Sequence, residues 1–406
     1  MKMILSIAWR NIWRNKTRSW VVIGSILVGI WSILFMLSFS YGLITTYVDN
    51  TIRYQSSHIQ IHNPDWKEDQ EVEFTLENTE SVLQYINNQS YQSSATQRTL
   101  VNGMVRSSRG ARGAMIKGIH SEKEGQVSHI DQKIVEGKYF TENKKNEIII
   151  AQKLAERLKL KIRKKLVLQF QNAQGDIVAG SFRIIGLFST ANTLYDESFV
   201  MIKQTDLNRL LVLPNASHEI AVFLDDSKEL AQVKSDIQNQ FPHLLIEDYK
   251  EISPDANLYE SQMEVSHRIF ITIFMLALIF GIINTMLMAV LERNKELGML
   301  MALGMNKTRV FFMIVFETLM LGIIALPFGL ILSWLSITYF GKHGVDLSAF
   351  SDGMEQFGMS TLIKSYIPTE LYFSLSTATV FTALLASIYP AIKAINLKPI
   401  EAMRKI

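Results

Sequence analysis

Four long stretches of the chain contain no charged residue, and this feature constrains the fold more than any other. Each stretch exceeds the roughly 20 helical residues needed to cross a hydrocarbon core about 30 Å thick. The stretches are Trp20–Leu43, Ile269–Leu291, Thr318–Phe340 and Leu371–Ile392. The first begins too late and runs too long for a cleavable signal peptide, so we expect it to remain as an anchor. The chain is therefore predicted to be an integral membrane protein with four helical spans, at 20–46, 269–291, 310–340 and 371–395.

The distribution of lysine and arginine predicts the orientation of these spans. Cations cluster before the first span, between the second and third, and after the fourth, whereas segment 341–370 has only Lys342 and Lys364 against four acidic residues. Cytoplasmic loops carry the excess of cations. We therefore expect residues 1–19, 292–309 and 396–406 in the cytoplasm, and 47–268 and 341–370 outside the bacterial inner membrane. Anionic membrane lipid accounts for the cations, and a net charge of +3 gives no reason to expect nucleic acid.

The large segment 47–268 mixes strand-like and helix-like patterns. Strand–helix–strand units are predicted near both of its ends, over His58–His62, Ser81–Asn88 and Gln97–Arg106, and over Glu219–Leu224, Ser227–Gln240 (capped by Ser227) and Leu244–Glu247. Further strands are predicted at Glu147–Ile150, Lys165–Phe170, Asp176–Val178, Phe182–Phe188 and Phe199–Ile202, in an inserted strand-rich subdomain at about 121–212. The predicted fold class is an α-helical four-span membrane domain with a large mixed α/β extracytoplasmic domain between spans one and two. Because the chain has no cysteine, this domain must be held together by its core.

Two short segments beside the spans have amphipathic helical spacing. In residues 1–19 the apolar positions are Leu5, Ala8, Trp9, Ile12 and Trp13. In residues 292–309 the corresponding positions are Leu297, Leu300, Met301 and Gly304, next to the cations Arg293, Lys295, Lys307 and Arg309. Such helices lie at a membrane surface, and the second would keep an apolar face available to a partner.

The second segment resembles the cytoplasmic coupling helix of the FtsX/MacB-type (type VII) ABC permeases, which has the pattern E-R-x-x-E-x-G-x-L-x-A-L-G. The matching residues are Glu292, Arg293, Glu296, Gly298, Leu300, Ala302, Leu303 and Gly304. The stretches KIVEGKYF and GDIVAGSFRIIGLF resemble the MacB-like periplasmic core domain. AWRNIWRNKTRSW and SHIQIHNP are most like the LolC/LolE lipoprotein-releasing branch.

The resemblance implies a permease subunit that couples cytoplasmic ATP hydrolysis to movement outside the membrane, releasing lipoproteins toward the outer membrane. The residues implied to contact the ATPase are Glu292, Arg293, Lys295, Glu296, Leu297, Gly298, Leu300, Leu303 and Gly304. Helical extensions at Tyr41–Gln55 and Asp255–Arg268 would carry the motion outward. The implied partners are a LolD-like ATPase, a second permease chain in a homo- or heterodimer, a lipoprotein and a periplasmic carrier. The hairpin that hooks the carrier in that family is replaced here by the short Gln169–Ser181.

An apolar cleft at the outer ends of spans one and two would suit the acyl chains of a lipoprotein. Candidate lining residues are Met36, Phe39, Leu43, Ile269, Phe270 and Ile273. The alternative is that these side chains face lipid or pack between helices.

Glu317 and Asn284 are polar residues inside the predicted spans. We expect Glu317 to form a structural ion pair near the coupling helix, the alternative being a proton relay. We expect Asn284 to form a hydrogen bond between helices instead of binding substrate.

No enzyme or cofactor is predicted for this chain. It has no G-x-x-x-x-G-K-[ST] motif and no protease or hydrolase signature, so ATP and Mg²⁺ would belong to a separate ATPase chain. No metal site is predicted, because the histidines of the large segment have no partners at ligand spacing: His58, His62, His120 and His129. Two functional alternatives remain, a MacB-like efflux permease, which usually carries a fused ATPase, and an FtsX-like signal transducer, which usually has a smaller outer domain. An enzyme in the outer domain is a more distant alternative.

Overall fold

The computed structural model describes residues 2–14, 16–89, 91–141, 144–190, 192–356, 359 and 361–396. The chain forms two compact units. The first, here called the membrane unit, comprises Met1–Leu43, Ser261–Val345 and Ile363–Ile406. The second, here called the exterior unit, comprises Ile44–Glu260 and Asp346–Leu362. Of the predicted tail 396–406, residues 397–406 lie outside the described residues.

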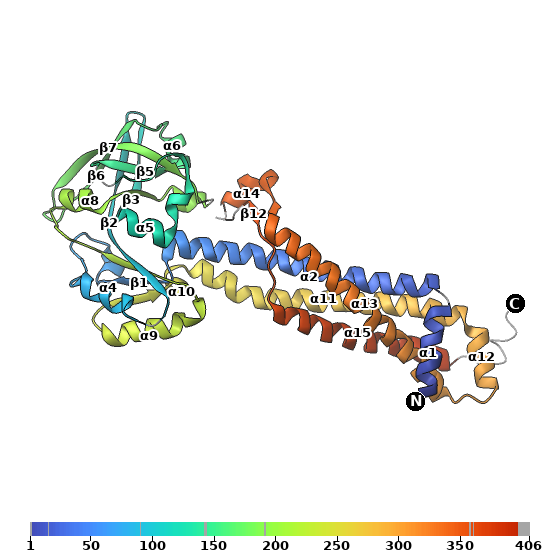
Figure 1. The fold of residues 1–406 in the computed structure, drawn as a ribbon. Coiled ribbons are helices and arrows are strands. Elements are labelled where there is room, and N and C mark those ends of the chain that lie inside the picture. The colour runs from blue at the N-terminus through green and yellow to red at the C-terminus, as the bar shows by residue number, and fades with distance from the viewer. Residues whose placement is uncertain are drawn as a thin grey trace. The chain divides into compact units, whose positions relative to one another are not determined.

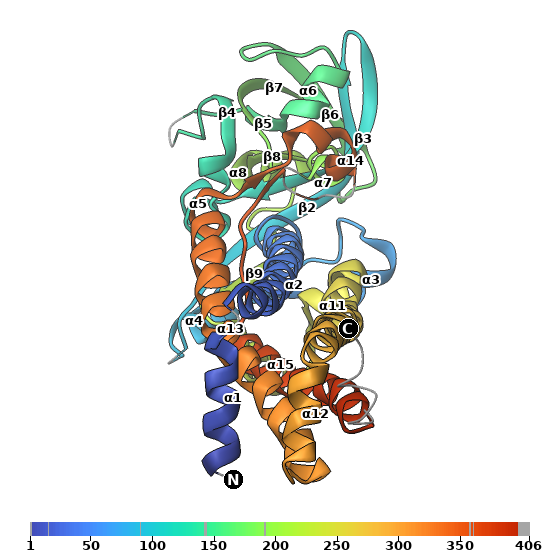
Figure 2. The same ribbon diagram turned by 90° about the vertical axis from the view of Figure 1, so that its right-hand side faces the viewer.

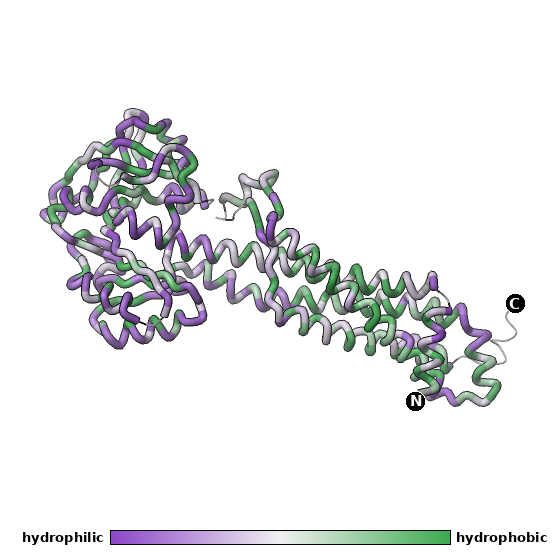
Figure 3. The backbone as a smooth tube through the Cα atoms, viewed as in Figure 1, coloured by the Kyte–Doolittle hydropathy of each residue, from purple (hydrophilic) through white to green (hydrophobic). Residues whose placement is uncertain are grey.

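Four long helices account for the predicted spans. They are α2 (Lys16–Asn50), α11 (Pro254–Glu292), α13 (Lys307–His343) and α15 (Thr369–Ile395) (Figure 1). Within the described residues these are the helices long and apolar enough to cross a membrane, and hydrophobic residues predominate along them in Figure 3. Helical structure extends beyond the apolar runs: α2 continues to Asn50 and into a π-helical turn at Thr51–Ser56, and α11 begins at Pro254.

Small residues allow close helix packing in the membrane unit. A Cβ at Gly329 of α13 would lie 3.0 Å from the Cβ of Ile30 on α2, and one at Gly322 would lie 3.2 Å from the Cβ of Ala383 on α15. Lipid tails are as apolar as the side chains, so helices in a bilayer are held largely by such close contact. Pro327 lies inside α13, and the helix continues through it.

The N-terminal helix α1 (Lys2–Arg14) packs on α13. Its buried stripe is Ile4, Ala8 and Ile12, which repeats every four residues. The prediction is thus corrected in two respects. The helix ends at Arg14, and the predicted apolar residues Trp9 and Trp13 are exposed, as suits a headgroup layer.

The exterior unit is built on one ten-stranded sheet of order β10-β1-β9-β2-β3-β8-β5-β7-β4, with β6 paired to β2 and β7. The strands are β1 (Ile59–His62), β2 (Ser93–Ser107), β3 (Gly110–Ile119), β4 (Ile134–Gly137), β5 (Glu147–Ala151), β6 (Lys165–Gln171), β7 (Ile177–Phe188), β8 (Phe199–Lys203), β9 (Glu219–Leu224) and β10 (Leu245–Asp248). Its described α-helices are α3 (Trp66–Asp69), α4 (Thr79–Asn87), α5 (Ser121–Ser128), α6 (Gln152–Arg157), α7 (Thr193–Asp196), α8 (Gln204–Leu211), α9 (Leu230–Gln240), α10 (Tyr249–Ile252) and α14 (Ser351–Gln356).

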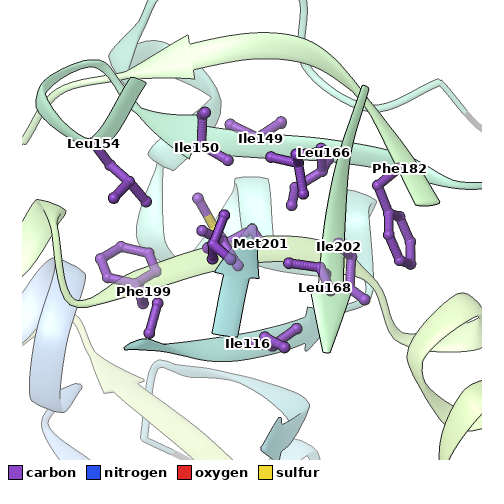
Figure 4. Close-up of a cluster of buried hydrophobic side chains, with 14 of the residues drawn as sticks. Ile116, Ile149, Ile150, Leu154, Leu166, Leu168, Phe182, Phe199, Met201 and Ile202 are labelled. Atoms are coloured by element: carbon purple, nitrogen blue, oxygen red, sulfur yellow. The ribbon is translucent and has the colours of Figure 1, made fainter. Parts of the chain in front are cut away.

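Two hydrophobic cores lie along this sheet. In the larger, side chains from β3, β5, β6, β7, β8 and α6 meet (Figure 4). In the smaller, α4 and α9 contribute Val82, Val233 and Ile237 against β1, β9 and β10. The predicted subdomain at 121–212 supplies most of the larger core, but it is not separate, because β3 pairs with β8 and β2 pairs with both β3 and β9.

Three local predictions need correction. Strand β3 was not expected, because its glycines and arginines obscure the alternation of buried residues. The segments predicted as two strands at Asp176–Val178 and Phe182–Phe188 form the single strand β7. The turn before α9 is capped by Asp226, which accepts a hydrogen bond from the Lys228 backbone N–H, and not by Ser227.

Candidate functional site

The segment predicted to couple to an ATPase forms the short helix α12 (Asn294–Ala302). The helix ends in a Schellman motif, in which the Gly304 N–H donates to the Met301 carbonyl at 3.1 Å and the Met305 N–H donates to the Leu300 carbonyl at 3.0 Å. Gly304 has φ of +97°, a conformation that a side chain would disfavour. The last glycine of the motif therefore fixes where α12 stops. Asn306, whose side chain caps α13, follows at once.

One face of α12 is buried within the chain. Leu297 is 2 % exposed, and Gly298 beside it is also buried. Leu300 is half-buried against the core of the membrane unit. The interpretation of Leu297 and Gly298 as residues that contact a partner is therefore wrong in this arrangement. They dock α12 on its own chain.

The opposite side of α12 is open. Leu303 is 80 % exposed and Met299 is 55 % exposed. The predicted residues Glu292 and Lys295 are exposed too, as are Lys307 and Arg309 at the start of α13. Exposed leucine and methionine flanked by cations form a surface that a partner protein could cover.

A row of four charged side chains ties α12 to α1 and α13. Arg14 of α1 pairs with Glu296 of α12. Arg293 donates from Nε to Glu296 at 3.0 Å and from Nη1 to both Glu317 oxygens of α13, at 3.1 and 3.2 Å. We call Arg14, Glu296, Arg293 and Glu317 the charge ladder. The ion pair predicted at Glu317 is confirmed.

Burial changes steadily along the charge ladder. The side chains of Arg14 and Glu296 are 56 % and 44 % exposed, whereas those of Arg293 and Glu317 are 14 % and 2 % exposed. Burial alone would raise the pKa of Glu296, but hydrogen bonds from Arg14 and Arg293 hold it below its usual value. Glu296 therefore stays charged at neutral pH. Sequence reasoning missed Arg14, whose partner is 282 residues away.

A groove of about 400 Å³ runs between α2 and α11 within the membrane unit. Its walls are apolar except for two serines, and they comprise Ser25, Val28, Gly29, Ile30, Ser32 and Ile33 from α2, with Phe274, Met275, Ala277, Leu278 and Gly281 from α11. Gly29 leaves room for the close approach of Leu278, whose Cδ1 would lie 3.3 Å from an added Cβ. The space in the groove thus depends on Gly29, which has no side chain.

The predicted cleft residues lie next to this groove but do not line it. Met36, Ile269 and Ile273 are exposed, at 36, 54 and 56 %. Phe39, Leu43 and Phe270 are half-buried. The groove lies between the same two helices, closer to their α1 and α12 ends than the predicted residues are. Sequence spacing does not reveal where two helices separate.

The expectation for Asn284 is not met within the chain. Its side chain is exposed on α11, and the described residues include no hydrogen-bond partner for it on another helix. An unpaired amide in hydrocarbon is costly.

His58, His62 and His218 of the exterior unit form internal hydrogen bonds. His58 Nδ1 accepts from the Leu224 N–H at 3.2 Å, and His218 Nδ1 accepts from the Leu100 N–H at 3.1 Å. Burial lowers the pKa of both His58 and His218 to about 4. His62 donates to the His218 carbonyl at 2.8 Å. In the described part of the chain, no three potential ligands gather where they could hold a metal ion.

Two family models match the sequence over regions that correspond to these structural parts. The model of the MacB-like periplasmic core domain matches residues 19–240. The model of the FtsX-like permease C-terminal region matches residues 268–399, which include α12 and the charge ladder residues Arg293, Glu296 and Glu317.

Individual proteins match at low identity. The lipoprotein-releasing system transmembrane protein LolC of Haemophilus influenzae is 23 % identical over 301 residues, covering 69 % of this chain and 71 % of that protein. The ABC transporter permease YtrF of Bacillus subtilis is 25 % identical over 202 residues, covering 47 % of this chain and 43 % of that protein. The periplasmic region of MacB from Actinobacillus actinomycetemcomitans, a solved structure, is 16 % identical and has a TM-score of 0.35, covering 50 % of this chain and 94 % of that one.

Proposed function

The chain belongs to the FtsX-like, MacB-like family of ABC transporter permeases, and on this basis we propose that it releases lipid-anchored proteins from the outer leaflet of the inner membrane. Membership of this family implies an ABC ATPase partner and a second permease chain. The observation that carries the choice of substrate is the apolar groove between α2 and α11. The similarity to LolC, whose name describes lipoprotein release, supports it.

In this proposal both termini and α12 face the cytoplasm, where the ATPase binds. The contact surface is the exposed side of α12, with Met299 on the helix and Leu303 at its C-cap. When the ATPases close, the charge ladder makes α1, α12 and the start of α13 move together. Long helices transmit such displacements because they resist bending over many turns, and α2 and α11 both run from the membrane unit into the residues of the exterior unit.

The groove suits an acyl chain for a reason of shape more than of hydrophobicity. Moving a methylene group from water into an apolar site is favourable by about 0.8 kcal/mol. Moving it from a bilayer into the same site gains almost nothing. Selectivity must therefore come from fit. The groove has the small residues Gly29, Ala277 and Gly281 along its walls, and its volume is about 400 Å³.

A second permease chain would supply the environment that Asn284 lacks. The amide is exposed on α11, which has the smallest buried share of the four spans. Contact with a second chain would replace lipid around Asn284 by a hydrogen-bonding partner. We propose no carrier contact at the β6–β7 hairpin, because it closes in a tight turn at Asn172–Asp176.

Site-specific photo-crosslinking tests the choice of substrate. A crosslinker at Val28 or Leu278, both of which line the groove, should trap the acyl anchor of a lipoprotein before ATP is added. The adduct should fall several-fold when ATP is supplied. A crosslinker at Ile331, which is 56 % exposed on α13 outside the groove, is the matched control and should give lipid adducts only.

Equal trapping at all three positions would show that the lipoprotein approaches no preferred helix pair, and would contradict the proposal. Trapping of a soluble exported molecule instead would favour an efflux permease, and trapping of a wall hydrolase would favour a signal transducer. These outcomes leave membership of the family intact and change only the substrate.

A further inference from the structure

The exterior unit contains a second cavity whose chemistry differs from that of the membrane groove. It measures about 890 Å³, and its lining residues come from β4, β5, β6 and β7 and the segments beside them. Figure 2 shows these four strands in one part of the exterior unit. Six of its lining residues are cations: Lys138, Lys144, Lys145, Arg163, Lys165 and Arg183. Glu147 is the one acidic residue among the described lining residues. We call this cavity the basic pocket.

The six cations are exposed and not neutralised by the described part of the chain. None of them has an ion pair to a described acidic residue, while nearby cations such as Arg157 and Arg209 do. With Glu147 counted, the lining carries a net five positive charges. Counting Glu142, which lies outside the described residues, would still leave four. Concentrated charge of one sign in a concave site attracts counter-ions strongly.

The register of the sheet adds to the repulsion. Lys165 of β6 lies directly opposite Arg183 of β7 in the antiparallel ladder. Like charges at opposed positions of two strands destabilise a sheet. Placing these two cations opposite each other costs stability, and no described acidic residue offsets that cost. We take this as an indication that the cations bind a ligand.

The backbone beneath the cations is fixed. The N–H groups of Lys138 and Arg163 donate to the carbonyls of Ile185 and Ile184 in β7, at 3.0 and 2.8 Å. The Arg183 N–H donates to the Asn146 carbonyl at 2.9 Å. Segments from three other parts of the chain are thus tied to β7, and the cations are held around the cavity before any ligand arrives.

The loop that carries Lys144 and Lys145 is anchored from its buried side. Lys203, which is 9 % exposed, donates from Nζ to the carbonyls of Thr141 and Lys144, the latter at 2.6 Å. Asn146 has a left-handed backbone with φ of +56°, and its N–H donates to Asp206 at 2.8 Å. Arg163 is left-handed as well, with φ of +68°. Strained residues held by surrounding hydrogen bonds are concentrated at binding sites.

We infer that the basic pocket binds a molecule carrying two or more phosphate groups. A phosphate monoester carries about −1.5 to −2 charges at pH 7, so two or three of them match the charge of the lining. Arginine contributes paired donors to phosphate oxygens and lysine contributes point charges, and the pocket has both. Its volume fits a compact ligand, because binding cavities for small molecules span about 300–1,000 Å³. The source is either a soluble polyphosphate or the headgroup of a multiply phosphorylated lipid.

The test uses the full chain purified in detergent, with tripolyphosphate and a short-chain cardiolipin as separate probes, measured by calorimetry at constant ionic strength. The double variant Lys165→Gln/Arg183→Gln should weaken binding of the preferred probe at least tenfold. The matched control Arg109→Gln/Lys123→Gln removes the same charge from exposed sites outside the pocket, and should change binding less than twofold. Without ligand, the Lys165→Gln/Arg183→Gln variant should unfold at the same temperature as the unmodified chain or higher, because the repulsion is relieved.

Tighter binding of cardiolipin would assign a lipid headgroup, and tighter binding of tripolyphosphate would assign a soluble ligand. Binding of neither probe above orthophosphate, or equal weakening by both double variants, would overturn the inference. Tighter binding of a hexaglutamate peptide than of either probe would also overturn it, in favour of an acidic protein segment. The photo-crosslinking results in the membrane groove are independent of each of these outcomes.

Discussion

The membrane unit and the exterior unit each hold an arginine between two glutamates. In only one of the two clusters are all the charged side chains buried, and we call that one the closed cluster. In the exterior unit Arg98 donates to Glu124 at 2.7 and 2.9 Å and to Glu219 at 2.6 Å, and all three side chains are at most 5 % exposed. In the membrane unit Arg293 bridges the buried Glu317 and the half-exposed Glu296, and the row continues to Arg14 at the surface.

This difference distinguishes a structural cluster from one that can respond to a partner. Burial alone would lower the pKa of Arg98 and raise that of Glu219. The opposite charges prevail, so the pKa of Arg98 lies above its usual value and that of Glu219 below. Such a cluster fixes β2, β9 and α5 and has no exposed member. The charge ladder has an exposed end beside the open face of α12, so a protein bound there can shift it.

Opening the closed cluster should have the largest effect. Arg98→Ala leaves Glu124 and Glu219 buried without their partner, and removing one member of a buried ion pair costs about 3–5 kcal/mol. Hydrogen exchange measured by mass spectrometry should show this loss of stability as weaker protection of the backbone amides of β2 and β9. Arg109→Ala, at an exposed site, is the control. A loss below about 1 kcal/mol for Arg98→Ala would mean that the cluster is not structural.

Removing the buried end of the charge ladder should have a smaller effect. Glu317→Gln weakens two hydrogen bonds from Arg293, but Arg293 keeps Glu296, so we expect a cost of about 1.5–3 kcal/mol. Arg14→Gln, at the exposed end, should cost less than about 1 kcal/mol. Protection of α12 and α13 against hydrogen exchange would measure both. Equal losses from the two variants would contradict the gradient of burial along the ladder.

Acidification should destabilise the exterior unit by about 2 kcal/mol. His58 and His218 have folded-state pKa values of about 4, below the unfolded value of about 6.5. Their contribution to the free energy of unfolding is complete above pH 6.5. It is lost as the pH falls toward 4, because the unfolded chain then binds more protons than the folded chain. Between pH 6 and 5 the two together should cost the exterior unit about 2 kcal/mol. Protection of β9 would fall over this range, and a flat profile would show that both histidines are accessible.

The sequence predicted well those features that depend on local pattern. The four spans follow from uncharged runs. Gly304, which was placed on the apolar face of the predicted helix, instead ends α12 in a Schellman motif. Glu317 was placed correctly in an ion pair, because an acid near the end of a span has few other stable environments.

The features that sequence did not reveal depend on contacts between distant residues. Arg14 and Glu296 are far apart in sequence, and neither has a local signal for the other. The groove depends on how α2 and α11 separate near Gly29 and Gly281, which helical periodicity does not determine. Leu297 was interpreted as a contact for a partner because amphipathic spacing identifies an apolar face but not what covers it.

The most direct test of the account is whether the exposed face of α12 holds the ATPase. Leu303→Asp places a charge at a side chain that is 80 % exposed, so it should leave the permease folded and inserted. Val212→Asp, at an exposed site in the exterior unit, is the matched control. The account predicts that the ATPase co-purifies with the unmodified chain and with Val212→Asp, and at least tenfold less with Leu303→Asp. Co-purification with Leu303→Asp at the level of the control would contradict it.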